Sequence, residues 1–253
     1  DAPVHNGRWT RVARLAPASI APTQRAVART RLLLDRYGIV SRPCLTGEQM
    51  SGGFGPMYKV LRELEEQGRV RRGYFVEGLA GAQFAYAGAI DRLRSGRSAV
   101  EERDHLVSAD DTQLLAALDP ANPYGAIAPW PDTGEQEPRT PRRAAGCWVL
   151  LTRGRPALYL SGGGRKLLTF PATLRDEEGA LAAALEALRS LPKGAYRGSL
   201  TIETIDGEAA RESALLDQFL AAGFSRDYKG LMDVRPDNLR AIPGRRSASK
   251  GSA

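Results

Sequence analysis

The sequence has few of the residues on which most metal and catalytic sites depend. Its 253 residues include two cysteines, Cys44 and Cys147, and two histidines, His5 and His105. The cysteines are far apart and have no CxxC partner, and neither histidine has a neighbour at the spacing of a metal-ligand pair or a catalytic triad. The pattern therefore predicts no metal site. We expect two buried free thiols and surface histidines in a protein of the reducing cytoplasm.

Several longer motifs are also missing. The pattern GxxxxGK[ST] does not occur, which excludes a P-loop ATPase from this chain, and no cofactor site is predicted. The glycine-rich stretch SGGGRK, residues 161–166, leads into a predicted strand and is interpreted as a hairpin turn. No apolar run approaches the ~18 residues that a membrane span needs. The first residues, DAPVHNGRW, contain neither a methionine nor a signal-peptide pattern, so we expect a piece of a longer chain.

Positive charge is concentrated in two parts of the chain. Lys and Arg outnumber Asp and Glu by 17 to 11 in residues 1–105 and by 5 to 1 in residues 235–253. Residues 106–234 carry 14 basic and 17 acidic residues, so they are net acidic. A polyanion is the natural partner of the two basic parts. Arginine-rich surfaces also accompany GC-rich genomes, so charge by itself is a weak argument.

The first third of the chain predicts a winged helix. A helix over residues 23–37, capped by Thr23 and ended by Gly38, precedes a short β-prone segment and a short helix. Residues 54–68 follow as a strong amphipathic helix with apolar residues at i, i+3, i+4 and i+7. Residues 70–86 then alternate around a Gly-Leu-Ala-Gly break, which indicates a hairpin with a tight turn. This order is a helix-turn-helix followed by a β-hairpin wing.

The residues expected to contact nucleic acid lie on the second helix of that motif and on the wing. They are the ones left outside the apolar stripe of the helix and the arginines at the start of the hairpin: Tyr58, Lys59, Arg62, Arg69, Arg71 and Arg72. Winged helices also serve as protein-interaction modules, and the helix carries acidic residues at its far end. The basic footprint favours nucleic acid.

The rest of the chain predicts an α+β module. Residues 88–116 look helical in two stretches, and a Pro-rich charged segment over 129–143 follows. Three short β runs over 146–170 indicate a meander, followed by a helix over 176–191, a strand near 199–208, a helix from Ser213 to Gly223 and a last strand. The predicted parts are a linker 1–22, a winged helix 23–105, a helical and Pro-rich connector 106–145, the β-rich module 146–234 and a disordered basic tail 235–253.

The stretch LDPANPYG, residues 118–125, admits two interpretations. Asp119, Asn122 and Tyr124 supply the carboxylate, amide and aromatic ring that base excision needs, for an oxocarbenium-like centre and for a flipped base. The same residues are turn formers beside two prolines, with Asp119 capping the loop. We favour the turn. Asp206 is assigned to a Asp-Gly turn, while Asp233, a lone carboxylate in the final strand, remains a catalytic candidate.

The motifs RRGYFVEGLAGAQFA, GAIDRLR, LDPANPYG, LLTFP and GFSRDYKGL resemble the C-terminal region of the bacterial large helicase-related (Lhr) superfamily 2 helicases. The resemblance spans residues 7–234. It implies a parent with an ATP- and Mg-dependent 3′ to 5′ DNA helicase motor, a role in DNA repair, and a C-terminal region of tandem winged helices that is associated with homo-oligomers. That region is similar to winged-helix glycosylases of crosslinked bases. Their Gln-x-Gln pair is missing here, because Gln83 stands alone.

Three hypotheses follow. The chain is a DNA-binding accessory module of a repair helicase, with the helicase core of the same parent chain as its partner. Alternatively, it is a DNA glycosylase for uracil or damaged bases that uses Asp119 or Asp233. Alternatively, it is a homo-oligomerisation module that docks through the apolar helices at 176–191 and 213–223. None of the three involves a membrane.

Overall fold

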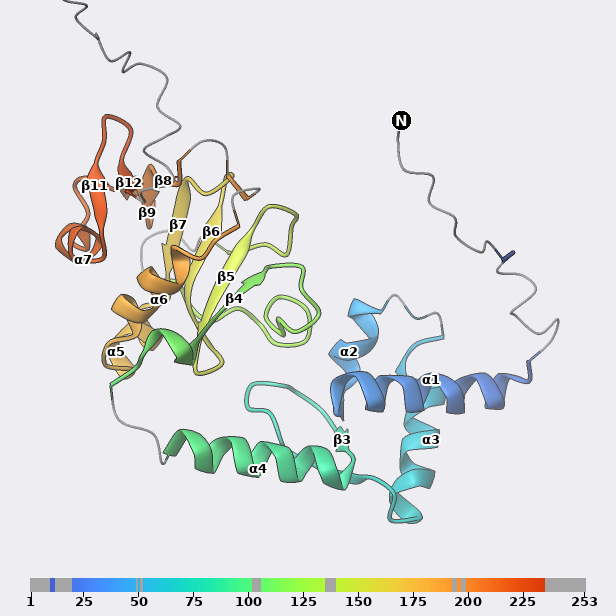
Figure 1. Cartoon of the computed structure of the whole chain (residues 1–253). Coiled ribbons are helices and arrows are strands. Elements are labelled where there is room, and N and C mark those ends of the chain that lie inside the picture. The colour runs from blue at the N-terminus through green and yellow to red at the C-terminus, as the bar shows by residue number, and fades with distance from the viewer. Residues whose placement is uncertain are drawn as a thin grey trace, which may run out of the picture. The chain divides into compact units, whose positions relative to one another are not determined.

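The computed structural model describes residues 10–11, 20–48, 50, 52–101, 106–134, 140–192, 195–196 and 199–234, and Figure 1 shows their helices and strands. They belong to two compact units, residues 1–96 and 97–253. No helix of the described part is long and apolar enough to cross a membrane. The predicted basic tail, most of the predicted linker and both histidines lie outside the described residues. The finer five-part division of the chain stays a prediction.

The first unit is a winged helix, as predicted. Its elements are α1 (Pro22–Tyr37), β1 (Ile39–Val40), α2 (Arg42–Gly47), α3 (Phe54–Glu66), β2 (Arg71–Gly73), β3 (Gln83–Ala85) and the start of α4 (Ala87–Glu101). The strands form an antiparallel sheet in the order β1-β3-β2. The helix-turn-helix is α2 and α3 (Figure 1), and β2 and β3 are the two strands of the wing.

The core of this unit lies between α1 and α3. Leu33 and Leu34 of α1 and Leu61 and Leu64 of α3 are buried. Phe84 of β3 is also fully buried. The spacing of three and four residues places each pair on one face of its helix. Burying each side chain contributes about 1.5–3 kcal/mol, which holds α3 against α1.

Two local predictions for this unit are wrong. The first helix begins at Pro22 with Ala21 as N-cap, and Thr23 lies inside its first turn. Proline is favoured there because its fixed φ suits the first turn and its missing N–H costs nothing. The hairpin does not close by a tight turn at Gly78–Gly81. A long loop over residues 74–82, called here the wing loop, joins β2 to β3.

The described residues of the second unit form two sheets and three α-helices that follow the end of α4. Its elements are the 3₁₀ turn η2 (Ala109–Asp111), β4 (Thr112–Ala116), β5 (Trp148–Thr152), β6 (Arg155–Ser161), β7 (Lys166–Thr169), α5 (Pro171–Asp176), α6 (Ala180–Leu188), β8 (Thr201–Ile202), β9 (Thr204–Ile205), β10 (Glu208–Ala209), α7 (Leu216–Ala221), β11 (Phe224–Arg226) and β12 (Leu231–Asp233). The predicted meander is β5-β6-β7. The α+β class predicted for the chain is confirmed.

The larger sheet has the order β10-β9-β7-β6-β5-β4, and the smaller one has the order β11-β12-β8. The larger sheet is mixed, because β7 and β9 are parallel while its other pairs are antiparallel. Helix α6 packs on β4, β5 and β6 and closes the core of the unit (Figure 1). Leu150, Leu158, Leu185 and Leu188 are completely buried there.

The largest error of the sequence-based prediction concerns residues 112–116. They were predicted as helix in a connector, but they form the edge strand β4 and pair along their whole length with β5. The hydroxyls of Thr112 and Thr152 lie 3.0 Å apart across this pair. The pairing partner is remote in sequence, so a local pattern does not reveal it.

The elements after residue 170 also differ in their bounds. The helix predicted over 176–191 is shortened to α6, Ala180–Leu188, which begins after Gly179 in a left-handed conformation, φ 83°, and α5, which ends at Asp176, was not predicted. The predicted helix from Ser213 to Gly223 is shortened to α7, with Ser213 lying before it. The strand predicted near 199–208 divides into β8, β9 and β10, which serve both sheets, and β11 was not predicted.

Candidate nucleic-acid interface

The outer face of α3 is basic in its first half and acidic in its second. Lys59, Arg62, Glu63 and Glu66 are exposed and follow the helical spacing of three and four residues, so they share this face. Arg62 Nη2 lies 3.1 Å from Glu66 Oε1 in an ion pair whose two side chains are more than half exposed. Lys59 has no ion-pair partner among the described residues. It is therefore the most available cation on the helix.

Tyr58 does not lie outside the apolar stripe of α3, contrary to the sequence-based prediction. Its ring is half-buried and packs edge-on against Phe84 of β3, with ring centres 5.8 Å apart, and at the same separation from Phe54. This packing ties the recognition helix to the wing sheet. A contact of Tyr58 with DNA stays a prediction, and its geometry favours a role in positioning α3.

Arg71 and Arg72 are exposed neighbours on β2, and their side chains leave opposite faces of the strand. Arg72 faces α3, where its Nε lies 3.3 Å from Glu65 Oε1. Arg71 has no ion-pair partner in the described part of the chain, and the same holds for the exposed Arg69 just before the strand. Sequence reasoning predicted the same role for Arg71 and Arg72, but in the structure Arg71 is more available to a phosphate than Arg72.

A single buried side chain organises the wing loop. The Gln83 amide oxygen accepts hydrogen bonds from the backbone N–H groups of Phe75 and Val76, both at 2.9 Å. Its amide nitrogen donates to the carbonyls of Val76 at 2.9 Å and Leu79 at 3.0 Å. Gln83 is 0% exposed. All four of its hydrogen-bonding positions are used inside the loop, so this glutamine shapes the wing and is not available to a base.

The wing loop holds Tyr74 away from the protein. This side chain is 91% exposed, directly after β2, whereas an aromatic ring is normally at least partly covered. The ring of Phe75 lies over Gly73, where a Cβ would come within 2.9 Å of it, so the chain on either side of Tyr74 is fixed. Sequence reasoning missed Tyr74. The sequence signal for an exposed ring was its position two residues after the exposed Arg72, because side chains two residues apart in a strand lie on the same face.

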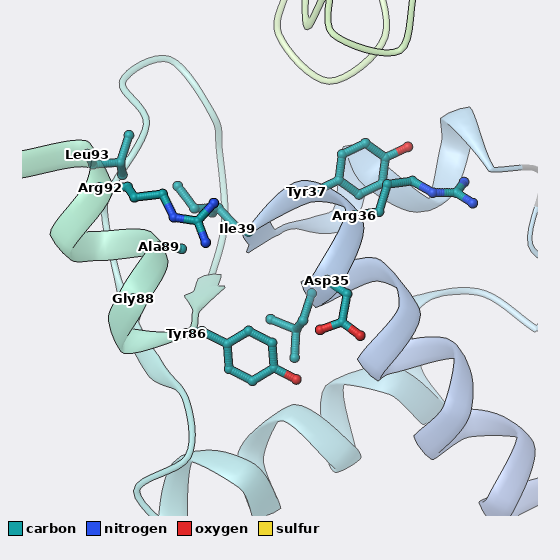
Figure 2. Close-up of a pocket in the computed structure, with 11 residues that line it drawn as sticks. Asp35, Arg36, Tyr37, Ile39, Tyr86, Gly88, Ala89, Arg92 and Leu93 are labelled. Carbon is teal, nitrogen blue, oxygen red and sulfur yellow. The ribbon is translucent and has the colours of Figure 1, made fainter. Parts of the chain in front are cut away.

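A hollow of about 500 Å³ lies between the C-terminal end of α1 and the start of α4. Figure 2 shows Asp35 and Tyr86 pointing toward one another across it, with Arg92 extending from α4. Gly38 ends α1 with φ 69°, and a Cβ there would lie 3.2 Å from the side chain of Ala89. Of the two cations in its lining, Arg36 is already bound to Glu48 and Arg92 shares the lining with Asp35, so the hollow is kept apart from the interface.

The end of α1 is fastened to residue Glu48 after α2. The Glu48 carboxylate accepts hydrogen bonds from the Tyr37 hydroxyl at 2.6 Å and from the Arg36 guanidinium. Burial, followed by the bond to Glu48, raises the pKa of Tyr37 to about 12. The bonds from Tyr37 and Arg36 lower the pKa of Glu48. This clamp connects the first helix of the unit to the helix-turn-helix.

The LDPANPYG loop is held together by the residues that suggested catalysis. Asp119 Oδ1 accepts from the Ala121 N–H at 2.8 Å, as a loop-capping residue does. Asn122 is buried, with its Nδ2 donating to the Ala117 carbonyl at 2.9 Å and its Oδ1 accepting from the Tyr124 N–H at 3.1 Å. Both ends of that amide are thus engaged. The geometry favours the turn, and the catalytic role of these residues stays a prediction.

Tyr124 and Arg143 complete the same loop. The Tyr124 hydroxyl donates to the Gly154 carbonyl at 3.0 Å, and its ring stacks on Trp130 with centres 5.8 Å apart. Arg143 donates to four loop carbonyls, the shortest bond being 2.6 Å to Asn122. Gly125 has φ 73° and no room for a Cβ beside Trp130. The loop is therefore rigid, and stacking a base on Tyr124 would require displacing Trp130 on that face.

Asp233, the other catalytic candidate, is 0% exposed at the end of β12. Its Oδ1 lies 3.1 Å from Nε of Arg189, which is 34% exposed and also donates to the Ala222 carbonyl at 3.4 Å. Asp119 follows β4 in the larger sheet, whereas Asp233 belongs to the smaller one. The ion pair between Arg189 and Asp233 links the end of α6 to β12. Asp206 is a turn residue with φ 49°, as predicted, and its carboxylate accepts two bonds from Thr169.

The apolar faces of the two helices proposed for homo-oligomerisation are buried inside the second unit. Ala184, Leu185 and Leu188 of α6 and Phe219 of α7 are completely buried in the core with the sheets. The surface that this hypothesis requires is thus already covered by the same chain, and oligomerisation stays a prediction.

The described geometry defines a winged-helix protein in which the first half of α3 and the start of the wing carry exposed cations. Residues 19–105 match the family model described as the winged-helix domain of large helicase-related protein. Over 237 residues the chain is 41% identical to "Lhr helicase/ probable uracil glycosylase" of Mycolicibacterium smegmatis, covering 90% of this chain and 15% of that protein. Over 228 residues it is 36% identical to "Lhr helicase/uracil glycosylase" of Escherichia coli K12, covering 89% of this chain.

The chain spans 15% of the length of the first relative and 14% of the second. The resemblance that the sequence motifs indicated is confirmed. The activities in the relatives' names belong to those longer proteins.

Proposed function

We propose that this chain is a DNA-binding accessory module of an ATP-dependent DNA repair helicase, and that it holds DNA through the winged helix. The observation that carries the proposal is the set of exposed cations without ion-pair partners on α3, the following turn and β2: Lys59, Arg69 and Arg71. Such cations gain most from phosphate, because no carboxylate among the described residues pairs with them.

Within this function the residues have different roles. Lys59 and Arg62, in the first half of α3, bind the backbone beside the groove that the helix enters. Arg69 and Arg71 bind phosphates next to the wing, and Arg72 contributes less because Glu65 already neutralises it. Tyr74 supplies a ring on which an unpaired base stacks. The ATP and Mg of the helicase motor belong to the parent protein, whose core is the partner of this module.

The test compares two triple variants of the chain in binding labelled duplex and single-stranded DNA. Replacing Lys59, Arg69 and Arg71 with alanine should lower the slope of log Kobs against log[salt] by about 2.7 for duplex DNA. Replacing Arg25, Arg31 and Arg92, which are exposed cations of the same unit on α1 and α4, should leave that slope unchanged. Equal slopes for the two triple variants would refute the proposal.

A second candidate function is a DNA glycosylase for uracil or another damaged base, favoured by the names of both relatives. Asp119 is the partly exposed carboxylate and Asp233 the buried one. The chain would be incubated with a strand carrying one uracil, and abasic sites would be revealed with alkali. Cleavage that is lost in Asp119→Asn or Asp233→Asn, while DNA binding and folding remain, supports this function. No cleavage by the wild-type chain counts against it.

A further inference from the structure

Residues 106–234, which are net acidic, contain a pocket whose lining is basic. Its volume is about 550 Å³, which is within the range of sites for small molecules. Arg165 and Lys229 line it together with one acid, Glu203, and with the hydroxyl residues Ser199 and Thr201. Two cations against one carboxylate is the reverse of the balance in residues 106–234, where 17 acidic residues face 14 basic ones.

Close backbone packing fixes Lys229. The turn between β11 and β12 is closed by hydrogen bonds between Asp227 and Gly230, at 2.8 Å and 3.2 Å. A Cβ on Gly230 would lie 2.0 Å from the carbonyl oxygen of Ile202, so the turn rests directly on the end of β8. Lys229, in the middle of that turn, is thus held at the pocket even though its own side chain is exposed.

The opposite wall is equally constrained. Arg165 lies in the turn between β6 and β7, where Gly162, Gly163 and Gly164 all have positive φ. A Cβ on Gly164 would come within 3.0 Å of Leu200, so the turn is packed tightly against the chain that leads into β8. Gly162 and Gly163 line the pocket without a side chain, which leaves their backbone accessible to a ligand.

An exposed aromatic ring accompanies the cations. Tyr228 is 74% exposed, and the Lys229 ammonium lies 5.2 Å from the centre of its ring. A guanidinium and an ammonium suit a phosphate, and an exposed ring beside them suits an unpaired base. Hydroxyl and carboxylate groups in the lining can accept or donate hydrogen bonds to the sugar or base edge.

From these observations we infer that the pocket binds one nucleotide of single-stranded DNA, with its phosphate on Arg165 and Lys229 and its base on Tyr228. This inference rests on the proposed function, because the strand that the pocket binds is part of the DNA that the winged helix holds. It adds a second, sequence-independent contact on the other unit. It also identifies single-stranded DNA as the form that is bound, because a base that is paired and stacked in a duplex cannot stack on a tyrosine.

The test uses the full chain and a labelled oligothymidylate. Arg165→Ala combined with Lys229→Ala should weaken binding and lower the log–log salt slope by about 0.7, as expected when the contact to one phosphate of a single strand is lost. The matched control, Lys166→Ala with Arg226→Ala, removes two exposed cations outside the lining and should change neither. Tyr228→Ala should weaken binding about tenfold, and Tyr228→Phe should not. Equal affinity of the pocket and control variants would overturn the inference.

A second measurement separates this inference from the proposed function. Thymidine monophosphate is titrated into isotope-labelled chain while the backbone amide signals of Gly162 and Gly163 are followed. Shifts that saturate with the nucleotide, and that are absent in the double variant, support the pocket even if the winged helix fails to bind DNA. Inorganic phosphate acting as well as the nucleotide would overturn base recognition. Unmoved amides, in a chain that still binds DNA, would overturn the pocket and leave the winged-helix function standing.

Discussion

Arg71 and Arg72 are adjacent in β2, but only Arg72 has a carboxylate partner in the described structure, Glu65 at 3.3 Å. Strand alternation sends the two guanidinium groups to opposite faces. Glu65, in the acidic second half of α3, thus neutralises Arg72, whereas Arg71 stays available to a ligand. The wing and the recognition helix are coupled through this ion pair.

Glu65→Ala should therefore strengthen DNA binding. The substitution frees Arg72 and removes a negative charge beside the wing, so the affinity and the salt slope for duplex DNA both rise, the slope by up to about 0.9. The measurement is fluorescence anisotropy over a range of salt concentrations. As a control, Glu63→Ala removes an exposed carboxylate whose hydrogen-bond partner, at 3.0 Å, is the neutral Gln67. A Glu65 variant that binds more weakly than wild type would contradict the assignment.

Tyr74→Ala should reduce affinity for single-stranded DNA more than for duplex. Stacking of one base on an aromatic side chain contributes about 1–3 kcal/mol. Stability should stay within about 0.5 kcal/mol of wild type, because a side chain exposed to this degree has almost no contacts to lose. Tyr74→Phe should retain the affinity. Equal losses on both DNA forms would show that the ring does not stack on an unpaired base.

Gln83→Leu should destabilise the first unit by about 3 kcal/mol in chemical denaturation. The leucine leaves two N–H groups and two carbonyls of the wing loop without partners. Gln67→Leu is the matched control, since that exposed glutamine makes only a surface bond to Glu63, and it should cost less than about 0.5 kcal/mol. A Gln83 variant as stable as the control would mean that the wing loop is held by something else.

The clamp at Glu48 predicts a loss of stability at both ends of the pH scale. Burial and the bond to Glu48 raise the pKa of Tyr37 from 10.0 to about 12, so its contribution is complete below pH 10 and disappears as pH rises toward 12. The pKa of Glu48 is lowered from its ordinary value of 4.5, mainly by the Tyr37 bond and then by Arg36. Its contribution is therefore present above that value and is lost as pH falls.

Thermal unfolding of wild type and Tyr37→Phe across this pH range tests the clamp. The phenylalanine variant should be less stable near neutrality, and its stability should change less between pH 10 and 12. Parallel curves for the two proteins would contradict the assignment of the alkaline transition to Tyr37.

The two carboxylates of the glycosylase hypothesis should differ in stability. Asp233→Ala leaves Arg189 without its buried partner and should cost about 3 kcal/mol. Asp119→Ala removes one loop-capping bond and should cost about 1 kcal/mol. Denaturation of both variants must therefore precede any cleavage assay. Similar stabilities of the Asp233 and Asp119 variants would show that the ion pair between Asp233 and Arg189 does not stabilise the fold.

The sequence predicted those elements whose pattern is local. The period of α3 and the alternation of β5 to β7 are visible in a short window, so the winged helix and the meander were found. The strand nature of residues 112–116 comes from pairing with β5, which is remote in the chain. Tyr74 was missed for a related reason, because its exposure follows from the bonds that Gln83 makes across the wing loop. Arg165 and Lys229 meet in a pocket only after β8 and β12 have paired.

The most direct test of the central claim follows the backbone amide signals of the chain while a short duplex is added. The account predicts that, within the first unit, the largest shifts occur in the first half of α3, at Arg69 and Arg71, and in the wing loop around Tyr74. Residues of the hollow between α1 and α4 should stay nearly unchanged. Shifts confined to that hollow or to the second unit, with α3 and the wing unmoved, would contradict it.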